Sequence, residues 1–230
     1  MKWNKLYKYP KSKRELLKGD RHYDVNDEKL PRVTTILQAT LDAEKAESLK
    51  RGTQKVGEAA ARRVLEQATK RGTAMHSYLE TYLQGGQVLD LRDIGREASS
   101  MAETIIDRGF KDIEEIWGSE VTLFYPNLYA GATDLCGIYQ GRESIIDFKS
   151  SNKPKKVEWI TDYKLQMVAY AMAHNCVYGT DIEQGVILMC TPDNLFQKFT
   201  INGREFRELK WEWLRRVDNY YVTNKSQNVA

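Results

Sequence analysis

The stretch from Leu128 to Ser151, LYAGATDLCGIYQGRESIIDFKSS, decides the fold of this 230-residue chain. It contains two apolar, β-branched runs separated by the turn-like residues 140–143 (Gln-Gly-Arg-Glu), a pattern typical of a β-hairpin. Asp147 and Lys149 are two positions apart, so on a strand they lie on the same face. Pairing across the hairpin brings Asp134 beside Asp147, and converging carboxylates repel each other unless a cation lies between them. The stretch therefore predicts a divalent-metal site next to a lysine.

Outward from the hairpin, apolar periodicity and turn residues predict the other elements. We expect residues 1–30 to be irregular, Thr34 or Thr35 to cap the first helix, and Gly72 to separate the second helix from the third. The predicted helices cover about 34–50, 54–70, 73–83, 96–117, 157–177 and 204–221, and the further strands 120–125, 186–190 and 195–201.

This order of elements predicts an α/β (α+β) fold, in which a mixed central β-sheet is flanked by helices and preceded by a helical region. We divide the chain into a basic N-terminal arm (1–32), a helical region carrying His76 (33–95), a core (96–223) and a flexible tail (224–230).

Composition and charge place the chain among ordinary globular proteins, with 41% hydrophobic and 29% charged residues. No apolar run approaches the roughly 20 residues of a membrane span. The start lacks the apolar region of a secretory signal, so we expect an intracellular, cytoplasmic protein. The net charge is +3, but the first 32 residues hold ten Lys or Arg against five acids. This segment is either an arm that meets a polyanion or a solvated tail.

Several side chains have two interpretations on the sequence alone. The aromatic residues of the N-terminal segment either stack on bases or pack the segment onto the body. The basic residues around the second helix either contact phosphate or form a solvated face. His76 and Glu80 are four apart and share a helix face, yet a histidine among apolar neighbours is more often a core residue than a metal ligand.

Four motifs follow one another on the predicted elements: Arg71–His76 (RGTAMH), Gly131–Asp134 (GATD), Ile145–Lys149 (IIDFK) and Gln166–Tyr170 (QMVAY). Together they resemble the PD-(D/E)XK nuclease superfamily, and in particular its RecB-like exonuclease branch. The resemblance covers roughly residues 70–200. It implies a restriction-endonuclease-like core.

The resemblance also implies roles for individual residues. Asp134 and Asp147 would bind a catalytic Mg²⁺ or Mn²⁺, one or two ions, with the backbone carbonyl of Phe148 as a further ligand. His76 would complete the set, and Glu120 would be a secondary acid, or else a solvated acid at the start of a strand.

Catalysis and nucleic-acid contact are assigned in the same way. Lys149 would orient or activate the attacking water. Gln166 and Tyr170 would position Lys149 or a phosphate, unless Tyr170 is simply a core residue. The residues predicted to contact nucleic acid are Arg51, Lys55, Arg62, Arg63, Arg71, Ser150, Lys153 and Tyr170.

One departure from the branch concerns cysteine. Several RecB-like members hold an iron–sulfur cluster on one upstream cysteine and three near the C-terminus. Cys136, Cys176 and Cys190 lack that spacing, so we predict no cluster and three reduced core cysteines. The resemblance is therefore closer to the compact, cluster-free mitochondrial and phage-encoded exonucleases, and a phage-encoded protein would act in the host cytoplasm.

The sequence thus predicts a metal-dependent hydrolase of phosphodiester bonds, a DNA exonuclease that acts on single-stranded ends in recombination, repair or genome processing. Its partners would be DNA and recombination or replication proteins, with no membrane. A structure- or sequence-specific endonuclease of the same fold is the first alternative. A DNA-binding module without cleavage and a purely structural metal site are the others.

Overall fold

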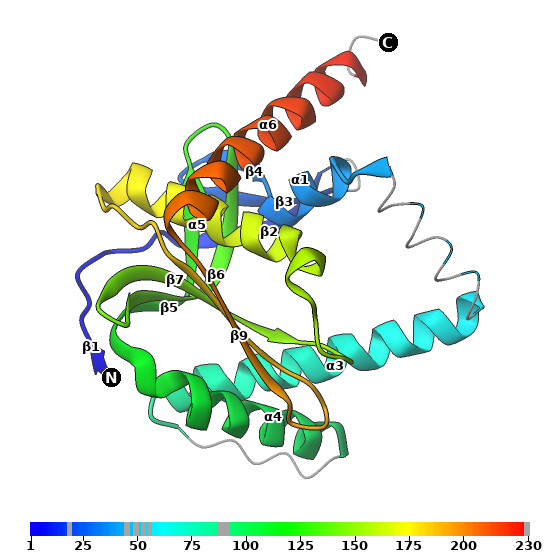
Figure 1. The fold of residues 1–230 in the computed structure, drawn as a ribbon. Helices are drawn as coiled ribbons and strands as arrows, with labels where there is room; N and C mark the ends of the chain where they lie inside the picture. Colours follow the sequence, from blue (N-terminus) through cyan, green and yellow to red (C-terminus); the bar gives the residue numbers. More distant parts are fainter. Residues whose placement is uncertain are drawn as a thin grey trace.

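The computed structural model describes residues 1–17, 20–43, 47, 51, 54, 57–86 and 93–227. Strands and helices follow one another in groups along this part of the chain (Figure 1). In order they are β1 (Lys2–Trp3), β2 (Ser12–Leu17), β3 (Asp20–Val25), β4 (Glu28–Pro31), α1 (Val33–Ala39), α3 (Glu58–Leu83), α4 (Asp93–Gly109), η1 (Phe110–Asp112), β5 (Ile113–Tyr125), β6 (Tyr129–Tyr139), β7 (Arg142–Ser150), η2 (Val157–Trp159), α5 (Thr161–Tyr178), β8 (Gly185–Cys190), β9 (Phe196–Ile201) and α6 (Gly203–Gln227).

A six-stranded mixed sheet forms the centre, in the order β1-β5-β6-β7-β8-β9. The β5–β6, β6–β7 and β8–β9 pairs are antiparallel, whereas β1–β5 and β7–β8 are parallel. A parallel neighbour requires a crossover, and α5 supplies it between β7 and β8. Helices α5 and α6 cover one face of the sheet and α3 and α4 cover the other (Figure 1). The predicted mixed sheet flanked by helices is confirmed.

The hairpin that decides the fold is β6–β7. Its register runs from Tyr139↔Arg142 to Leu135↔Ile146. Gln140 and Gly141 at the tip both have positive φ, 49° and 73°, as a two-residue hairpin turn with the right twist requires.

Beyond that register the two strands separate. The backbone N–H of Phe148 there donates to the carboxylate of Asp134, at 2.6 Å from Oδ2. The Asp134 carboxylate thus replaces a backbone carbonyl as the hydrogen-bond acceptor between the two strands. The strands separate at the residues predicted to be catalytic.

The two faces of β7 serve two cores. Ile145 packs with α5 and α6, while Ile146 and Phe148 pack with α3 and α4. The predicted alternation is therefore correct.

The N-terminal segment differs from the prediction of an irregular arm. Its first strand joins the central sheet, and β2–β4 form a separate three-stranded antiparallel sheet. Tyr23, Val25 and Leu30 of this small sheet pack against Phe124 and Ala130 of β5 and β6. Few buried positions hold the small sheet to the body, and its exposed positions carry Lys and Arg, so the apolar alternation is too sparse to be recognised.

The aromatic residues before β2 pack onto the body, which decides between the two interpretations of them. Tyr7 lies against Trp117 and Tyr178, with ring centroids 5.4 and 5.1 Å away. The hydroxyl of Tyr9 lies 2.9 Å from Cys136 Sγ and 3.1 Å from Nε2 of His174. These contacts leave neither ring free to stack on a base.

The helix boundaries need three corrections. Arg32, in extended conformation, precedes α1 without a side-chain cap, so neither Thr34 nor Thr35 caps this helix, which ends at Ala39. Gly72 does not interrupt α3, because the buried stripe continues past it and a single glycine costs only about 1 kcal/mol in a helix. At the C-terminus, α6 continues to Gln227, past the predicted end and into the predicted tail.

The segment 113–117 is strand instead of the predicted helix. Two irregularities in the β5–β6 register, between Ile113 and Glu115 and between Ile116 and Gly118, interrupt the alternation of faces. Ile113 and Ile116 therefore both face α3 and α4, although they are three residues apart. This spacing imitates a helical pattern.

Two further features bear on the expected class. None of the helices in the described part of the chain combines the length and apolar character that a bilayer crossing requires. Cys136 and Cys190 are buried and free, whereas Cys176 is exposed, contrary to its predicted core position.

Candidate active site

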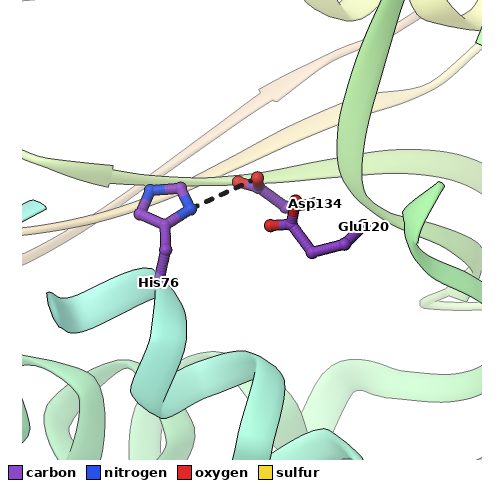
Figure 2. Close-up of side chains that lie close together, drawn as sticks. All are labelled: His76, Glu120 and Asp134. Atoms are coloured by element: carbon purple, nitrogen blue, oxygen red, sulfur yellow. Dashed lines mark ion pairs between the residues drawn. The ribbon is translucent and has the colours of Figure 1, made fainter. Parts of the chain in front are cut away.

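Three side chains from three elements meet where β6 and β7 separate. His76 of α3, Glu120 of β5 and Asp134 of β6 each offer a ligand atom, and these atoms all lie within 4.8 Å of one another. Figure 2 shows the His76 ring reaching from its helix toward the two carboxylates. Nδ1 of His76 lies 3.3 Å from Oδ1 of Asp134.

Local structure aims each of the three inward. Met75 and Leu79 bury α3 on the sheet, which places His76, beside Met75, at the edge of that contact. Asp134 is held through its bond from Phe148 N–H. Glu120 has φ = 52°, a left-handed conformation that costs a residue other than glycine roughly 1–3 kcal/mol. Such strain persists where the surroundings impose it, and it is concentrated at functional sites.

The electrostatics of this cluster combine two neighbouring carboxyl groups, Asp134 and Glu120, with the imidazole of His76. Burial acts to raise the pKa of Asp134, but His76, Lys149 and the bond from Phe148 N–H together lower it below its ordinary value. For His76, burial lowers the pKa and Asp134 raises it, with a net value of about 9. Glu120 is exposed as a whole, yet partial desolvation of its carboxyl group and the charge of Asp134 raise its pKa to about 7. A bound cation would relieve this crowding.

Asp147 and Lys149 form an ion pair beside the cluster. Asp147 is 2% exposed, and burial raises its pKa to about 6 although Lys149 opposes the rise. Burial acts to lower the pKa of Lys149, but Asp147 and Asp134 raise it above the ordinary value. The lysine is therefore a fixed positive charge. Its Nζ also lies 5.2 Å from the ring centroid of Tyr163, a residue outside the four motifs.

Tyr170 explains the glycine of the GATD motif. A Cβ at Gly131 would lie 2.5 Å from Cε1 of Tyr170 and 2.9 Å from its hydroxyl, so only glycine leaves room for the ring. Tyr170 is buried, and its hydroxyl accepts a hydrogen bond of 2.9 Å from Nε2 of Gln166. Both side chains line the cavity, but none of their described contacts is with Lys149.

One cavity of about 450 Å³ connects these groups. It brings together seven of the predicted residues: His76, Glu120, Asp134, Asp147, Lys149, Gln166 and Tyr170. Its other walls were not predicted from the sequence. They come from α3 (Gly72, Thr73, Ser77 and Glu80), from β6 (Ala132) and from the N-terminal segment (Arg14, Tyr23 and Arg32).

The residues predicted to contact nucleic acid differ in exposure and in their bonds within the chain. Arg71 is buried and bonds the side chains of Ser150, Asn152 and Glu97. It fastens α3 to the loop after β7, and its predicted phosphate contact stays a prediction.

The remaining predicted contacts are untested. Ser150 accepts the bond from Arg71, and Lys153 is exposed. Arg51 and Arg63 are exposed, Arg62 pairs with Glu66, and Lys55 lies outside the described residues. The Phe148 carbonyl stays a prediction as a metal ligand, since only its N–H has a described role at the site.

The donor set fits a divalent ion. Carboxylate oxygens are hard ligands that suit Mg²⁺, and a single imidazole among them is compatible with Mn²⁺. His76, Glu120 and Asp134 supply that combination, with Asp147 lining the same cavity. A metal of this kind is therefore compatible with the residues present, although the particular ion is not determined by them.

Comparison of the sequence with known proteins finds relatives that are named as exonucleases. No family model matches the chain. The sequence is 29% identical to human mitochondrial genome maintenance exonuclease 1 over 209 residues, which are 87% of this chain and 60% of the human protein. The Mus musculus and Xenopus tropicalis proteins of the same name are 28% and 26% identical, over 87% and 83% of this chain. The chain is therefore similar in sequence to proteins named as exonucleases.

These sequence relatives are longer than this chain, which spans about 60% of their length. Among solved structures, one from Eubacterium rectale has a TM-score of 0.45 and 13% sequence identity, covering 65% of this chain and 68% of its own.

Proposed function

We propose that the chain is a metal-dependent DNA exonuclease. One observation carries the proposal: the His76–Glu120–Asp134 cluster and the Asp147–Lys149 ion pair share a single cavity. Ligands for a divalent ion beside a fixed positive charge are the components that phosphodiester hydrolysis requires. The exonuclease names of the sequence relatives support the same reaction class.

The metal would be held by His76, Glu120 and Asp134, with Asp147 and the Phe148 carbonyl as further ligands. A bound Mg²⁺ or Mn²⁺ would neutralise the scissile phosphate and lower the pKa of a coordinated water.

The other side chains of the site act directly. Lys149, kept protonated by Asp147, faces the same cavity and offsets the negative charge that grows on the phosphoryl oxygens. Tyr170 and Gln166 form a second polar pair in the cavity wall. With its hydroxyl engaged by Gln166, Tyr170 holds a fixed orientation, and the pair can orient a phosphate oxygen through the remaining donors.

We propose a single strand as the preferred substrate. The cavity is lined by residues of α3 and by Arg14, Tyr23 and Arg32 of the N-terminal segment, and the substrate backbone would pass between them. A single strand is narrower than a duplex and can bring its phosphates to the bottom of such a cleft. We propose that this activity serves recombination, repair or genome processing; the relatives' name refers to genome maintenance.

The test is digestion of DNA labelled at the 5′ or the 3′ end, single- or double-stranded, linear or circular, with Mg²⁺ or Mn²⁺. We expect linear single strands to be degraded and circles to survive. Asp134→Asn should abolish the activity, while Glu208→Gln, which removes an exposed carboxylate on α6, should not. Cleaved circles would establish an endonuclease instead. DNA binding without any cleavage would establish a binding module.

A further inference from the structure

The small N-terminal sheet and the residue that follows it place a tyrosine and two arginines in the wall of the active-site cavity. Tyr23 of β3 is 1% exposed, and its hydroxyl has no hydrogen-bond partner among the residues that the structure describes. Tyr23, Arg14 of β2 and Arg32 all line the cavity that contains His76, Glu120 and Asp134. A buried phenol that lines a cavity and lacks an acceptor is uncommon, because buried hydroxyl groups are normally paired.

Both guanidinium groups lie close to the ring of Tyr23. Cζ of Arg14 lies 5.9 Å from the ring centroid of Tyr23, and Cζ of Arg32 lies 5.5 Å from it. Neither arginine forms an ion pair with a carboxylate in the described ranges, unlike Arg71, which is paired with Glu97. The stacked arrangement orders the guanidinium groups while leaving their N–H donors available.

A second hollow continues from this point. It has a volume of about 510 Å³ and shares Arg14, Tyr23, Glu120 and Ala132 with the first cavity. Its far side includes Lys11, an exposed residue just before β2. Arg14 and Tyr23 therefore lie between the cavity that contains His76, Glu120 and Asp134 and this second hollow beside the small sheet.

We propose that Arg14, Tyr23 and Arg32 form a phosphate-binding site that positions the substrate strand next to the His76–Glu120–Asp134 cluster. The two guanidinium groups would contact the phosphate oxygens, and the Tyr23 hydroxyl would donate to one of them. This inference rests on the proposed function and deepens it. The phosphate is either an internal phosphodiester or a terminal phosphate of the strand, and both have the oxygens that these donors recognise.

The test is binding of fluorescently labelled oligothymidylate without divalent metal, measured by fluorescence anisotropy over a range of salt concentrations. Arg14→Gln and Arg32→Gln should each raise Kd roughly 10-fold, and each should reduce the slope of log K against log salt by about 0.7. Lys29→Gln is the matched control: it removes one positive charge from the same small sheet, where Lys29 pairs with Glu15 outside the cavity. Its affinity should stay within about 2-fold of wild type.

Tyr23→Phe separates a binding role from a structural one. The substitution removes a hydroxyl that has no partner in the free protein, so we expect the thermal midpoint to stay unchanged or to rise. The same substitution should raise Kd about 5- to 10-fold, because the donor to the phosphate is lost. A purely structural tyrosine would not combine these two results.

The source of the phosphate is decided by comparing strands that carry a 5′-phosphate, a 3′-phosphate or only hydroxyl ends. If the wild type favours one phosphorylated end and Arg14→Gln abolishes that preference, the site holds a terminal phosphate. Equal loss on all strands indicates an internal phosphodiester.

Two results would overturn the inference: the arginine variants binding like Lys29→Gln, or a wild type that binds no strand. Because no metal is present, these readings are independent of cleavage. A wild type that binds through these residues but never cleaves would refute the proposed function and leave the phosphate site standing.

Discussion

Replacing Gly131 with alanine tests the contact that joins the hairpin to the polar pair on α5. The new Cβ would lie 2.5 Å from Cε1 of Tyr170, whereas carbon atoms in contact are normally about 3.5–4.0 Å apart. The ring must therefore move by about 1 Å or the strand must shift. Overpacking of this kind costs about 1–3 kcal/mol, offset by up to about 1 kcal/mol because alanine suits a strand better than glycine.

The expected net destabilisation is roughly 1–2 kcal/mol, or a fall in thermal midpoint of about 2–8 °C for a chain of this size. The effect on activity should be larger. Displacing Tyr170 by about 1 Å also displaces the hydroxyl that Gln166 holds, and an error of this size in a site costs up to about 100-fold in rate. The assays are thermal unfolding and single-turnover cleavage of a labelled single strand.

Gly141→Ala is the matched control. Gly141 has φ = 73° with nothing within 4 Å of a built Cβ, so alanine there is strained by about 1–2 kcal/mol at the hairpin tip but clear of the site. It should reproduce the loss of stability and retain the cleavage rate. Gly131→Ala combined with Tyr170→Leu should recover part of the lost stability, since the shorter side chain relieves the clash. Wild-type stability and rate in Gly131→Ala, or strictly additive losses in the double variant, would refute the reasoning.

Three further predictions concern residues around the site and in the core. Arg71→Gln should lower the thermal midpoint by roughly 4–12 °C, through loss of about 2–3 kcal/mol from its buried bonds, and leave metal-free DNA affinity within about 2-fold of wild type; a large loss of affinity would instead support its predicted phosphate contact. Glu120→Gln should raise the thermal midpoint of the metal-free protein by relieving repulsion with Asp134, and weaken Mn²⁺ binding measured by calorimetry roughly 10-fold or more; unchanged Mn²⁺ affinity would remove Glu120 from the ligand set. His174 is buried, and burial lowers its pKa to about 4, so its contribution to stability is complete above pH 6.5 and is lost as the pH falls toward 4. Urea unfolding at pH 7.5 and 4.5 should show that the wild type loses roughly 2–3 kcal/mol more than His174→Gln, and equal losses would contradict this assignment.

The hairpin and its consequences were predictable because their signals are local. Two-residue periodicity placed Asp147 and Lys149 on one face, and the residues between the strands marked the turn. His76 was uncertain on spacing alone. Its place depends on α3 packing across the sheet, a contact between residues distant in sequence, and only the motif order indicated it.

The N-terminal half of the cavity was missed for a different reason. Tyr23 and Arg14 reach the site through a small sheet that is anchored by few apolar residues. No periodic pattern reveals such a sheet. The buried fastening of Arg71 was likewise hidden, because a basic residue on a helix is ordinarily exposed and its partners lie in a distant loop. Pairwise contacts of this kind are set by tertiary packing, which a single sequence does not display.

The proposed hydrolysis of phosphodiester bonds in this cavity with a divalent ion is tested most directly by a single-turnover cleavage assay. The cleavage rate of a labelled linear single strand with Mn²⁺ is compared among wild type, Asp134→Asn, Lys149→Met and Glu208→Gln. We predict metal-dependent cleavage by wild type and Glu208→Gln, and rates at least about 100-fold lower in the other two variants. An inactive wild type, or an Asp134→Asn variant that cleaves at the wild-type rate, would contradict the account.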